Sequence, residues 1–518
     1  MADPHFATAR VERWRLSKPA AAGPHGVVTS QHYAAAEAGA AVLEAGGNAV
    51  DAAVTGALVL QTVEPWMSGL GACGYLMVAE PDGRVEVVEF TGRAPLRFDP
   101  EAYRPDPEGS VTFLGMPASA GQANVRGYTA AVVPGCVRGL AEALRRFGTI
   151  GFDRALAPAI ERARKGMAVD WHATLAIAMA ESDLRRDDGA RAVLMPGDTV
   201  PEPETVLPLP ALAATLERLA EAGPEDFYTG RIAERLAEDL RRGGSFITAE
   251  DLAAYQPSVY PASAAGIAGR QVHVAGDSSG GRRLHDALRH FDARRGAGPL
   301  DPGFYTAMTA ALRDAFAGHR ARLIPAELST TSSTTQLNAA DRDGRMVALT
   351  FTLLNRFGAR VLSPATGVLL NNGMSWFDPR PGRANSLRPG AFGPNNMCPV
   401  AITDSDGPFA VLGASGGNQI VPALAQVSAM LLHAGMGVEA ALNAPRINAG
   451  PAVGITVDID LPADCVAALE PLGPVRPAQR AVYPRPFASP SAIAREGGGF
   501  TGMADTTYPA SQASAATR

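Results

Sequence analysis

Two short segments of the sequence carry the residue types of nucleophilic catalysis. Residues 328–335 (LSTTSSTT) form a run of hydroxyl side chains, and residues 413–417 (GASGG) form a Gly-rich turn. A hydroxyl can attack a carbonyl carbon when a nearby base takes its proton. Backbone N–H groups at a turn before a helix can hold the oxyanion that this attack creates. The Gly-rich turn is therefore one candidate for an oxyanion site, and the role of the hydroxyl run is ambiguous from its residues alone.

Residue types alone leave other interpretations open. The hydroxyl run also has the composition of a flexible linker between a helix and a strand pair. The Gly-rich turn could instead hold a phosphate, although it lacks the Lys of a P-loop and the spacing of a dinucleotide fingerprint. At this level the sequence predicts a soluble α/β protein and leaves an enzymatic role open.

Composition excludes several classes of protein. The 518 residues are 46% hydrophobic and 19% charged, as in ordinary globular proteins, and the net charge of −6 does not favour nucleic acid as a partner. No apolar stretch suits a signal peptide or a membrane span, so we expect a cytoplasmic protein without a membrane partner. The nine histidines lack metal-ligand spacing, and we predict no metal and no cofactor. The cysteines are far apart and are expected to be reduced core thiols, at positions Cys73, Cys136, Cys398 and Cys465.

Sequence patterns place the elements that must position these segments. Residues 33–45 predict a small-residue helix that stops at a Gly pair, and Asn48 predicts the N-cap of a second helix. Residues 75–81 and 85–90 predict a strand hairpin, and residues 136–265 read mainly as helices. The part after the hydroxyl run is rich in predicted strands. These must pair with the N-terminal hairpin, which favours an α/β layered fold over a barrel.

Blocks spread over most of the chain resemble one known family. Read in order from about residue 26 to 500, they are similar to the γ-glutamyltransferase family of N-terminal-nucleophile hydrolases. The blocks are 26–32 (GVVTSQH), 46–53 (GGNAVDAA), 63–71 (VEPWMSGLG), 133–135 (VPG), 277–281 (DSSGG), 334–341 (TTQLNAAD), 370–372 (LNN), 396–399 (NMCP), 413–417 (GASGG) and 444–446 (APR).

The resemblance implies a four-layer αββα sandwich, one domain formed by two autoprocessed chains. It predicts an N-terminal extension at 1–25, a large subunit at 26–333, a small subunit at 334–500 and a tail at 501–518. The tail is polar and small, and we expect it to be flexible. The implied partners are a small-molecule substrate and the two subunits of one precursor, and a higher oligomer is left open.

The resemblance also assigns catalytic roles. Self-cleavage before Thr334 would free an α-amine with a reference pKa of about 7.7–8, which can take the proton from the hydroxyl of the same residue. Thr352 matches a second threonine that hydrogen-bonds the nucleophile. Gly416 and Gly417 match the glycines whose N–H groups hold the oxyanion.

The departures from the family pattern concern the pocket for the substrate head group. Thr91 stands where the family uses an Arg for the substrate α-carboxylate, with Arg93 nearby. An Asn pair replaces a Ser pair that shares this carboxylate, and Gly373 and Trp376 replace groups that hold the α-amino group. A buried carboxylate or ammonium needs partners. The residues that we predict to bind substrate instead are Arg93, Asn355, Trp376, Asn395 and Asn396.

These departures favour an amide hydrolase that acts on an acyl group other than γ-glutamyl. Residues 372–382 resemble the cephalosporin-acylase-like branch of the family. Three alternatives remain: a γ-glutamyltransferase or glutathione hydrolase, a C–C bond hydrolase of an actinobacterial secondary-metabolite (antibiotic) pathway, and an uncleaved non-catalytic homologue.

Overall fold

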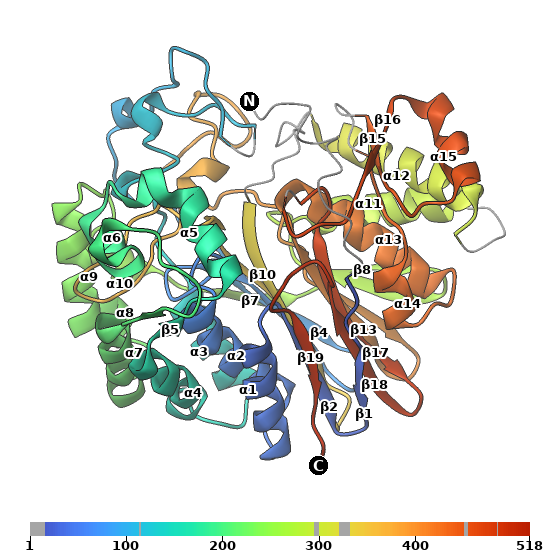
Figure 1. Cartoon of the computed structure of the whole chain (residues 1–518), viewed down its shortest axis with the longest axis horizontal. Coiled ribbons are helices and arrows are strands. Elements are labelled where there is room, and N and C mark those ends of the chain that lie inside the picture. Colours follow the sequence, from blue (N-terminus) through green and yellow to red (C-terminus); the bar gives the residue numbers. More distant parts are fainter. Residues whose placement is uncertain (1–15, 113–114, 295–299, 321–331, 450–453, 484) are drawn as a thin grey trace.

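A computed structural model describes residues 16–112, 115–294, 300–320, 332–449, 454–483 and 485–518. Two sheets of seven strands each form the centre of this part of the chain (Figure 1). The first sheet has the order β19 (Gln512–Ala515), β2 (Gly26–Ser30), β10 (Ser332–Asp341), β11 (Met346–Asn355), β3 (Cys73–Ala79), β4 (Val85–Phe90) and β7 (Ser258–Pro261). The second has the order β1 (Ala21–Gly23), β18 (Gly499–Ala504), β17 (Ser489–Glu496), β13 (Gly407–Ser415), β12 (Val400–Asp404), β9 (Arg270–Val274) and β8 (Ser263–Ile267).

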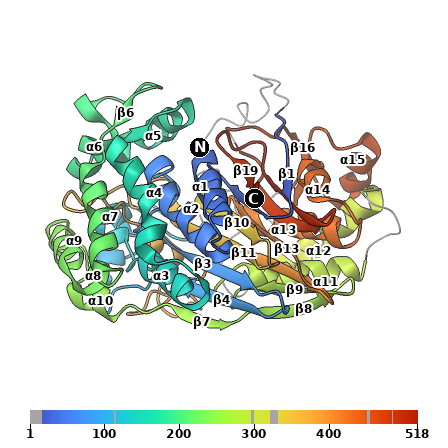
Figure 2. The same ribbon diagram turned by 90° about the horizontal axis from the view of Figure 1, so that it is seen from below.

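Helices cover the outer face of each sheet (Figures 1 and 2). On the side of the first sheet lie α1 (Tyr33–Glu44), α2 (Ala49–Val63), α3 (Cys136–Phe147), α4 (Phe152–Lys165), α5 (Trp171–Leu184), α6 (Asp188–Leu194), α7 (Pro210–Ala222), α8 (Asp226–Thr229), α9 (Arg231–Arg242) and α10 (Ala249–Ala254). On the side of the second sheet lie α11 (Gly281–Asp292), α12 (Pro302–Arg320), α13 (Ile420–Leu432), α14 (Val438–Asn443) and α15 (Ala463–Leu469). The layer order αββα confirms the predicted fold class.

Three apolar clusters fill the three spaces between these layers. Strand β3 contributes side chains to two of these clusters, one on each of its faces. Leu76 and Val78 belong to the cluster under the helices of the first sheet, whereas Tyr75 and Met77 belong to the cluster between the two sheets. Side chains of a strand alternate between faces, and here both faces are buried. This explains why β3 is buried at every position.

Local signals explain the helices that were predicted. The α1 helix spans Tyr33–Glu44, and α2 begins after the N-cap residue Asn48 with a capping box that includes Asp51. The capping box satisfies backbone N–H groups that have no partner within the helix. The predicted hairpin is β3 and β4, which pair antiparallel.

The C-terminal segment corrects a prediction. Residues 501–518 were expected to be flexible, but they complete β18 and form β19, which pairs with β2. The ammonium group of Lys18 binds this segment by donating to the carbonyl oxygens of Tyr508 (2.6 Å), Pro509 (2.8 Å) and Ser511 (2.8 Å). Backbone ladders order this tail despite its small polar side chains, and composition does not reveal such ladders.

Several further predictions concern single features. The hydroxyl run is partly described: residues 328–331 lie outside the described residues, and the remainder begins β10, not a linker. The four cysteines are free and buried, as expected. None of the helices described here is long and apolar enough to span a membrane.

Candidate active site

A bulge in the first sheet marks the position of the predicted nucleophile. In the antiparallel ladder, Ser333 pairs with Leu354 and Thr335 pairs with Phe351. Strand β11 therefore has one residue more than β10 at this point, and two of its residues lie opposite Thr334. A bulge re-aims side chains next to it and is frequent beside active sites.

The bulge brings two hydroxyl groups to one carbonyl oxygen. Residue Thr334 is only 5% exposed, and its hydroxyl donates to the Ser333 carbonyl oxygen at 2.8 Å. The Thr352 hydroxyl donates to the same oxygen. The backbone N–H of Leu354 donates to Thr352 Oγ1 at 2.7 Å and so holds this hydroxyl in place. In this uncleaved chain, Thr352 thus contacts the carbonyl before the nucleophile, whereas the family pattern predicted a bond to the nucleophile itself.

The predicted oxyanion turn lies against the nucleophile strand. Gly416 follows β13 and has a φ of 136°. Gly417 (φ 57°) begins the short helix η6 (Gly417–Gln419), which contacts β10 and leads into α13. A Cβ atom on Gly416 would lie 2.8 Å from the Cα atom of Ala488. Both the positive φ and this close approach require glycine at position 416.

One side chain that was not predicted links this turn to the nucleophile strand. Gln31 follows β2; its Oε1 accepts from the N–H of Gln336 at 3.2 Å, and its Nε2 donates to Ser415 Oγ at 2.6 Å. Gln31 therefore fixes the spacing between β10 and the turn at Gly416. It lies within the block 26–32 that carries the family resemblance, which was the available signal.

The two faces of β10 have different surroundings. Gln336 and Asn338 face the second sheet, where Asn338 Nδ2 donates to Ser491 Oγ at 2.9 Å. Thr335 faces the helices, and its hydroxyl donates to Glu64 Oε2 at 3.2 Å. Burial raises the pKa of Glu64 to about 8. Sequence reasoning missed Glu64, although it belongs to the block 63–71.

Two of the predicted substrate residues, Asn355 and Trp376, are buried, and a third, Arg93, is half-buried. The N–H of Asn355 donates to Asn372 Oδ1 at 3.0 Å, and Asn355 Oδ1 is buried without a partner in the described chain. Trp376 ends the short helix η5 (Gly373–Trp376), and its ring would lie 3.0 Å from a Cβ on Gly373. Arg93 stacks on Phe392, with 4.6 Å between the guanidinium carbon and the ring centre.

The predicted Asn pair is already engaged by protein groups. Asn395 Nδ2 donates to the Tyr75 hydroxyl at 2.9 Å, and Asn395 Oδ1 accepts from the N–H of Met397 at 3.1 Å. Asn396 Nδ2 donates to Asn418 Oδ1 at 2.5 Å, and Asn396 Oδ1 accepts from Arg283. The side chain of Asn395 thus has little capacity left for a substrate.

Arg283 is a cation that sequence reasoning missed. It lies on α11 and contacts Asn396, which in turn binds the residue after Gly417. No carboxylate in the described chain forms an ion pair with it, and burial lowers its pKa to about 10. A guanidinium group remains charged at neutral pH even so. A fixed positive charge therefore lies close to the predicted oxyanion turn.

Thr91 supplies no replacement for the missing Arg. Its hydroxyl donates to Glu89 Oε1 at 2.8 Å, and it is fully buried. Glu89 also accepts from Tyr260 at 2.5 Å and from Ser278 at 3.1 Å. Position 91, where the family resemblance leads one to expect an Arg, therefore offers no cation for a substrate carboxylate, and its hydroxyl is already bonded to Glu89.

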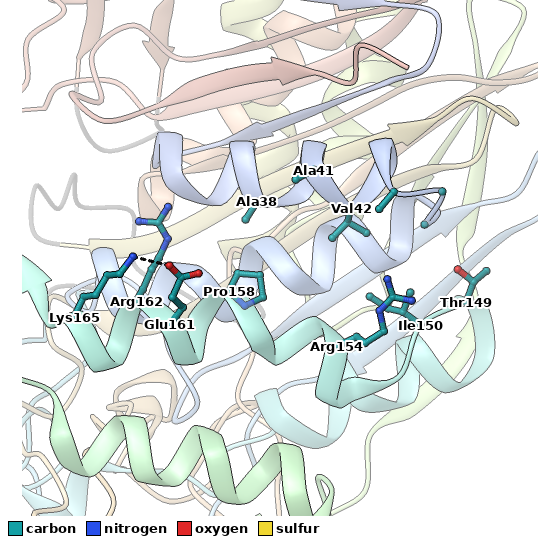
Figure 3. Close-up of a pocket in the computed structure, with 13 residues that line it drawn as sticks. Ala38, Ala41, Val42, Thr149, Ile150, Arg154, Pro158, Glu161, Arg162 and Lys165 are labelled. Atoms are coloured by element: carbon teal, nitrogen blue, oxygen red, sulfur yellow. Dashed lines mark hydrogen bonds and ion pairs between the residues drawn. The ribbon is translucent and has the colours of Figure 1, made fainter.

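A groove of about 510 Å³ lies elsewhere, between α1 and α4 (Figure 3). Arg154, Glu161, Arg162 and Lys165 point into it from α4, and Lys165 pairs with Glu161 at 2.5 Å. None of the candidate site residues lines this groove. The described residues also contain no group of three or more metal-ligating side chains.

Comparison with known proteins places the chain. The sequence model of the gamma-glutamyltranspeptidase family matches residues 35–324 and 318–515. The acylase ACY 1 proenzyme of Pseudomonas sp. (strain V22) is 32% identical over 478 residues, covering 85% of each protein. A glutathione hydrolase proenzyme of Escherichia coli (strain K12) is 29% identical over 477 residues, covering 82% of this chain and 80% of that protein.

A solved structure supports the same placement at the level of the fold. The cephalosporin acylase from Bacillus halodurans superimposes with a TM-score of 0.83 at 24% identity, covering 99% of both chains. The αββα fold and these relatives define an enzyme of the N-terminal-nucleophile hydrolase class. Within that class, the chain belongs to the gamma-glutamyltranspeptidase family, as the sequence blocks predicted.

The buried ring of His172 predicts how stability depends on pH. It packs edge-on against Trp66 (5.6 Å) and Tyr508 (5.0 Å), and burial lowers its pKa to about 3, with Arg485 and Arg356 adding to the effect. The unfolded chain binds this proton near pH 6.5, so the stability contributed by the neutral ring is complete above that pH and falls below it.

We expect His172→Gln to lose less stability than the wild type on acidification. Between pH 7 and pH 5 the difference should be about 2 kcal/mol, from about 1.4 kcal/mol per pH unit below 6.5. Urea unfolding at both pH values measures it. His32, whose pKa burial lowers to about 4, is common to both proteins and cancels. If both proteins lost the same free energy of unfolding between pH 7 and pH 5, His172 would not be the group responsible.

Proposed function

We propose that this chain is a self-cleaving amide hydrolase in which Thr334 is the nucleophile and the substrate acyl group lacks the γ-glutamyl head group. The observation that carries the proposal is the pair of hydroxyls on the Ser333 carbonyl oxygen, from Thr334 at 2.8 Å and from Thr352. The large and small chains would be residues 1–333 and 334–518.

The geometry suits an N-to-O acyl shift. Thr334 Oγ1 forms a bond to the Ser333 carbonyl carbon and the C–N bond of the peptide breaks. The hydroxyl proton of Thr334 moves to the departing nitrogen, which becomes the free α-amine. The Thr352 hydroxyl stabilises the charge that develops on the Ser333 oxygen. Water then hydrolyses the ester and leaves a carboxylate on Ser333 and a free α-amine on Thr334.

Turnover would reuse the same groups. The neutral α-amine takes the proton from Thr334 Oγ1, which attacks the substrate carbonyl. The N–H groups of Gly416 and Gly417 hold the oxyanion, and the α-ammonium gives its proton to the leaving amine as the C–N bond breaks. Water, which gives a proton to the same α-amine, then releases the acyl group and restores the Thr334 hydroxyl. The relatives named as an acylase proenzyme and a glutathione hydrolase proenzyme support a maturing precursor.

The surroundings of the site support a substrate without an α-amino-acid head group. Thr91 is bonded to Glu89, and Asn395 is engaged with Tyr75. Arg283 offers a positive charge from a different direction, which suits an acyl group that ends in a carboxylate. The rival candidate is glutathione hydrolysis, favoured by the relationship to the Escherichia coli protein.

The first prediction concerns maturation. Purified wild-type protein should give two bands on a denaturing gel, because Thr334 cuts the bond before it. Thr334→Ala should remain one chain and be inactive. N-terminal sequencing of the smaller band decides the site, and any first residue other than Thr334 contradicts the assignment.

The second prediction concerns Thr352. Replacing it with Val keeps the shape of the side chain but removes the hydroxyl on the Ser333 carbonyl oxygen, so cleavage should slow by about 10²–10³-fold. Thr352→Ser retains a hydroxyl and should mature at a rate within about tenfold of the wild type. A gel time course on freshly purified precursor measures both. Normal cleavage in a folded Thr352→Val protein would remove Thr352 from the mechanism.

The third prediction concerns specificity. Mature enzyme should hydrolyse γ-glutamyl-p-nitroanilide and glutathione poorly, because a buried charge without partners costs several kcal/mol. It should act better on an acyl amide or α-keto compound that lacks the α-ammonium group, such as an N-glutaryl amide. The measurement is kcat/KM on each compound. A value for glutathione of about 10⁴ M⁻¹s⁻¹ or more would make the pocket argument wrong.

A further inference from the structure

Glu64 is a buried carboxyl group that no step above uses. It caps the C-terminal end of α2, where its N–H donates to the Leu60 carbonyl at 2.7 Å, and it is fully buried. The carbonyls of the residues that follow, Trp66 and Met67, accept from the N–H groups of Phe357 and Leu353, each at 3.0 Å. This segment is therefore attached to the strand and loop that carry the bulge.

The carboxyl group contacts the nucleophile strand directly. Its Oε2 accepts from the hydroxyl of Thr335, the residue after the nucleophile, at 3.2 Å. The Tyr508 hydroxyl is directed at the carboxyl group and itself accepts from Trp66 Nε1 at 3.2 Å. No group in the described chain completes a well-formed hydrogen bond to Glu64 Oε1.

A buried carboxyl group with an unpaired oxygen destabilises a fold, so its presence needs a reason. In the uncleaved chain burial raises its pKa to about 8, and the group is largely neutral at pH 7. The groups that act on it are the hydroxyls of Tyr508 and Thr335 and the charge of Arg485, which favour the carboxylate, and Asp170, which opposes it.

Cleavage would create a new charge beside this group. An α-amine at Thr334 is protonated below its reference pKa of about 7.7–8, and residue 334 is almost inaccessible to water. A buried ammonium group requires a counter-charge. Among the side chains that form hydrogen bonds or ion pairs with residues 333–338 in the described chain, Glu64 provides the only carboxylate.

Resting on the proposed cleavage, we propose that Glu64 is a positioning residue that holds β10 through Thr335 and becomes the carboxylate counter-ion of the Thr334 α-amine. The step is a proton transfer: an N–H bond forms on Thr334 as the O–H bond of Glu64 breaks. Because Thr335 faces the helices, Glu64 acts from behind the strand and leaves the substrate side free.

The consequence is a raised pKa of the α-amine. An opposite charge within a few ångströms favours the charged form and typically shifts a pKa by one to three units. The amine must be neutral to act as a base, so Glu64 moves the working range of the enzyme toward alkaline pH. Replacing the carboxylate with an amide should lower the amine pKa by about one unit.

The test measures this amine without a substrate. Mature enzyme is labelled with 2,4-dinitrofluorobenzene over a series of pH values, and mass spectrometry quantifies the peptide that begins at Thr334. Exposed Lys165 is the internal reference, and Lys18 is the one other lysine of the sequence. We expect a wild-type amine pKa above 8, a value about one unit lower in Glu64→Gln, and a value near the wild type in Glu64→Asp.

Asp341→Asn is the matched control. Asp341 is also a buried carboxyl that joins β10 to α2, but at the opposite end, where it accepts from the N–H of Ala49 at 2.9 Å. It should leave the amine pKa unchanged. An equal shift in this variant, or no shift in Glu64→Gln, overturns the proposal.

Two further outcomes are informative. If Glu64→Gln fails to mature, the wild type still decides, because an amine that titrates at or below about 7.7–8 overturns the role of Glu64. If the wild type itself never yields a chain that begins at Thr334, the proposed function fails, and this inference fails with it. If the chain is cleaved before Thr334 but the pKa of the α-amine is not raised, the role of Glu64 is refuted and the proposed function stands.

Discussion

The hydrogen bonds to the Ser333 carbonyl oxygen depend on a one-residue irregularity in the pairing of β10 with β11. In a regular ladder, backbone N–H and C=O groups pair with each other and leave side chains to alternate between faces. Here the extra residue of β11 turns the Thr352 hydroxyl into the ladder, next to Thr334. The Gly-rich turn at Gly416, the Gln31 link and the buried carboxyl of Glu64 are all arranged around this point.

The two faces of β10 contact different polar groups. On the face toward the second sheet, the amide groups of Gln336 and Asn338 bond to each other, and Asn338 also binds the hydroxyl of Ser491. On the face toward the helices, Thr335 contacts the acid at the end of α2. Buried polar groups of this kind stabilise less than apolar packing would. Buried polar side chains therefore lie on both faces of β10 beside the bulge.

Local signals in the sequence predict the family and many of the elements, but not the C-terminal strand β19 and not the contacts. The α2 helix could be placed because Asn48 and Asp51 lie three residues apart and cap it. Glu64 and Thr335 are 271 residues apart, and Gln31 and Gln336 are 305 apart, so no local pattern joins them. The bulge leaves no mark in residue types, and β19 was missed because its small polar residues are ordered by backbone pairing.

The order of strands in the first sheet has a consequence for the proposed two-chain form. Strand β2 lies between β19 and β10, and β3 lies beside β11. Strands from before and after residue 334 are therefore interleaved in one hydrogen-bonded sheet. In the second sheet, β1 borders β18 in the same way. Pulling the two chains apart would therefore require breaking the central sheets and exposing their cores. In such a molecule, loss of quaternary structure and loss of tertiary structure are one event, and the cut severs the covalent chain without creating a separable subunit.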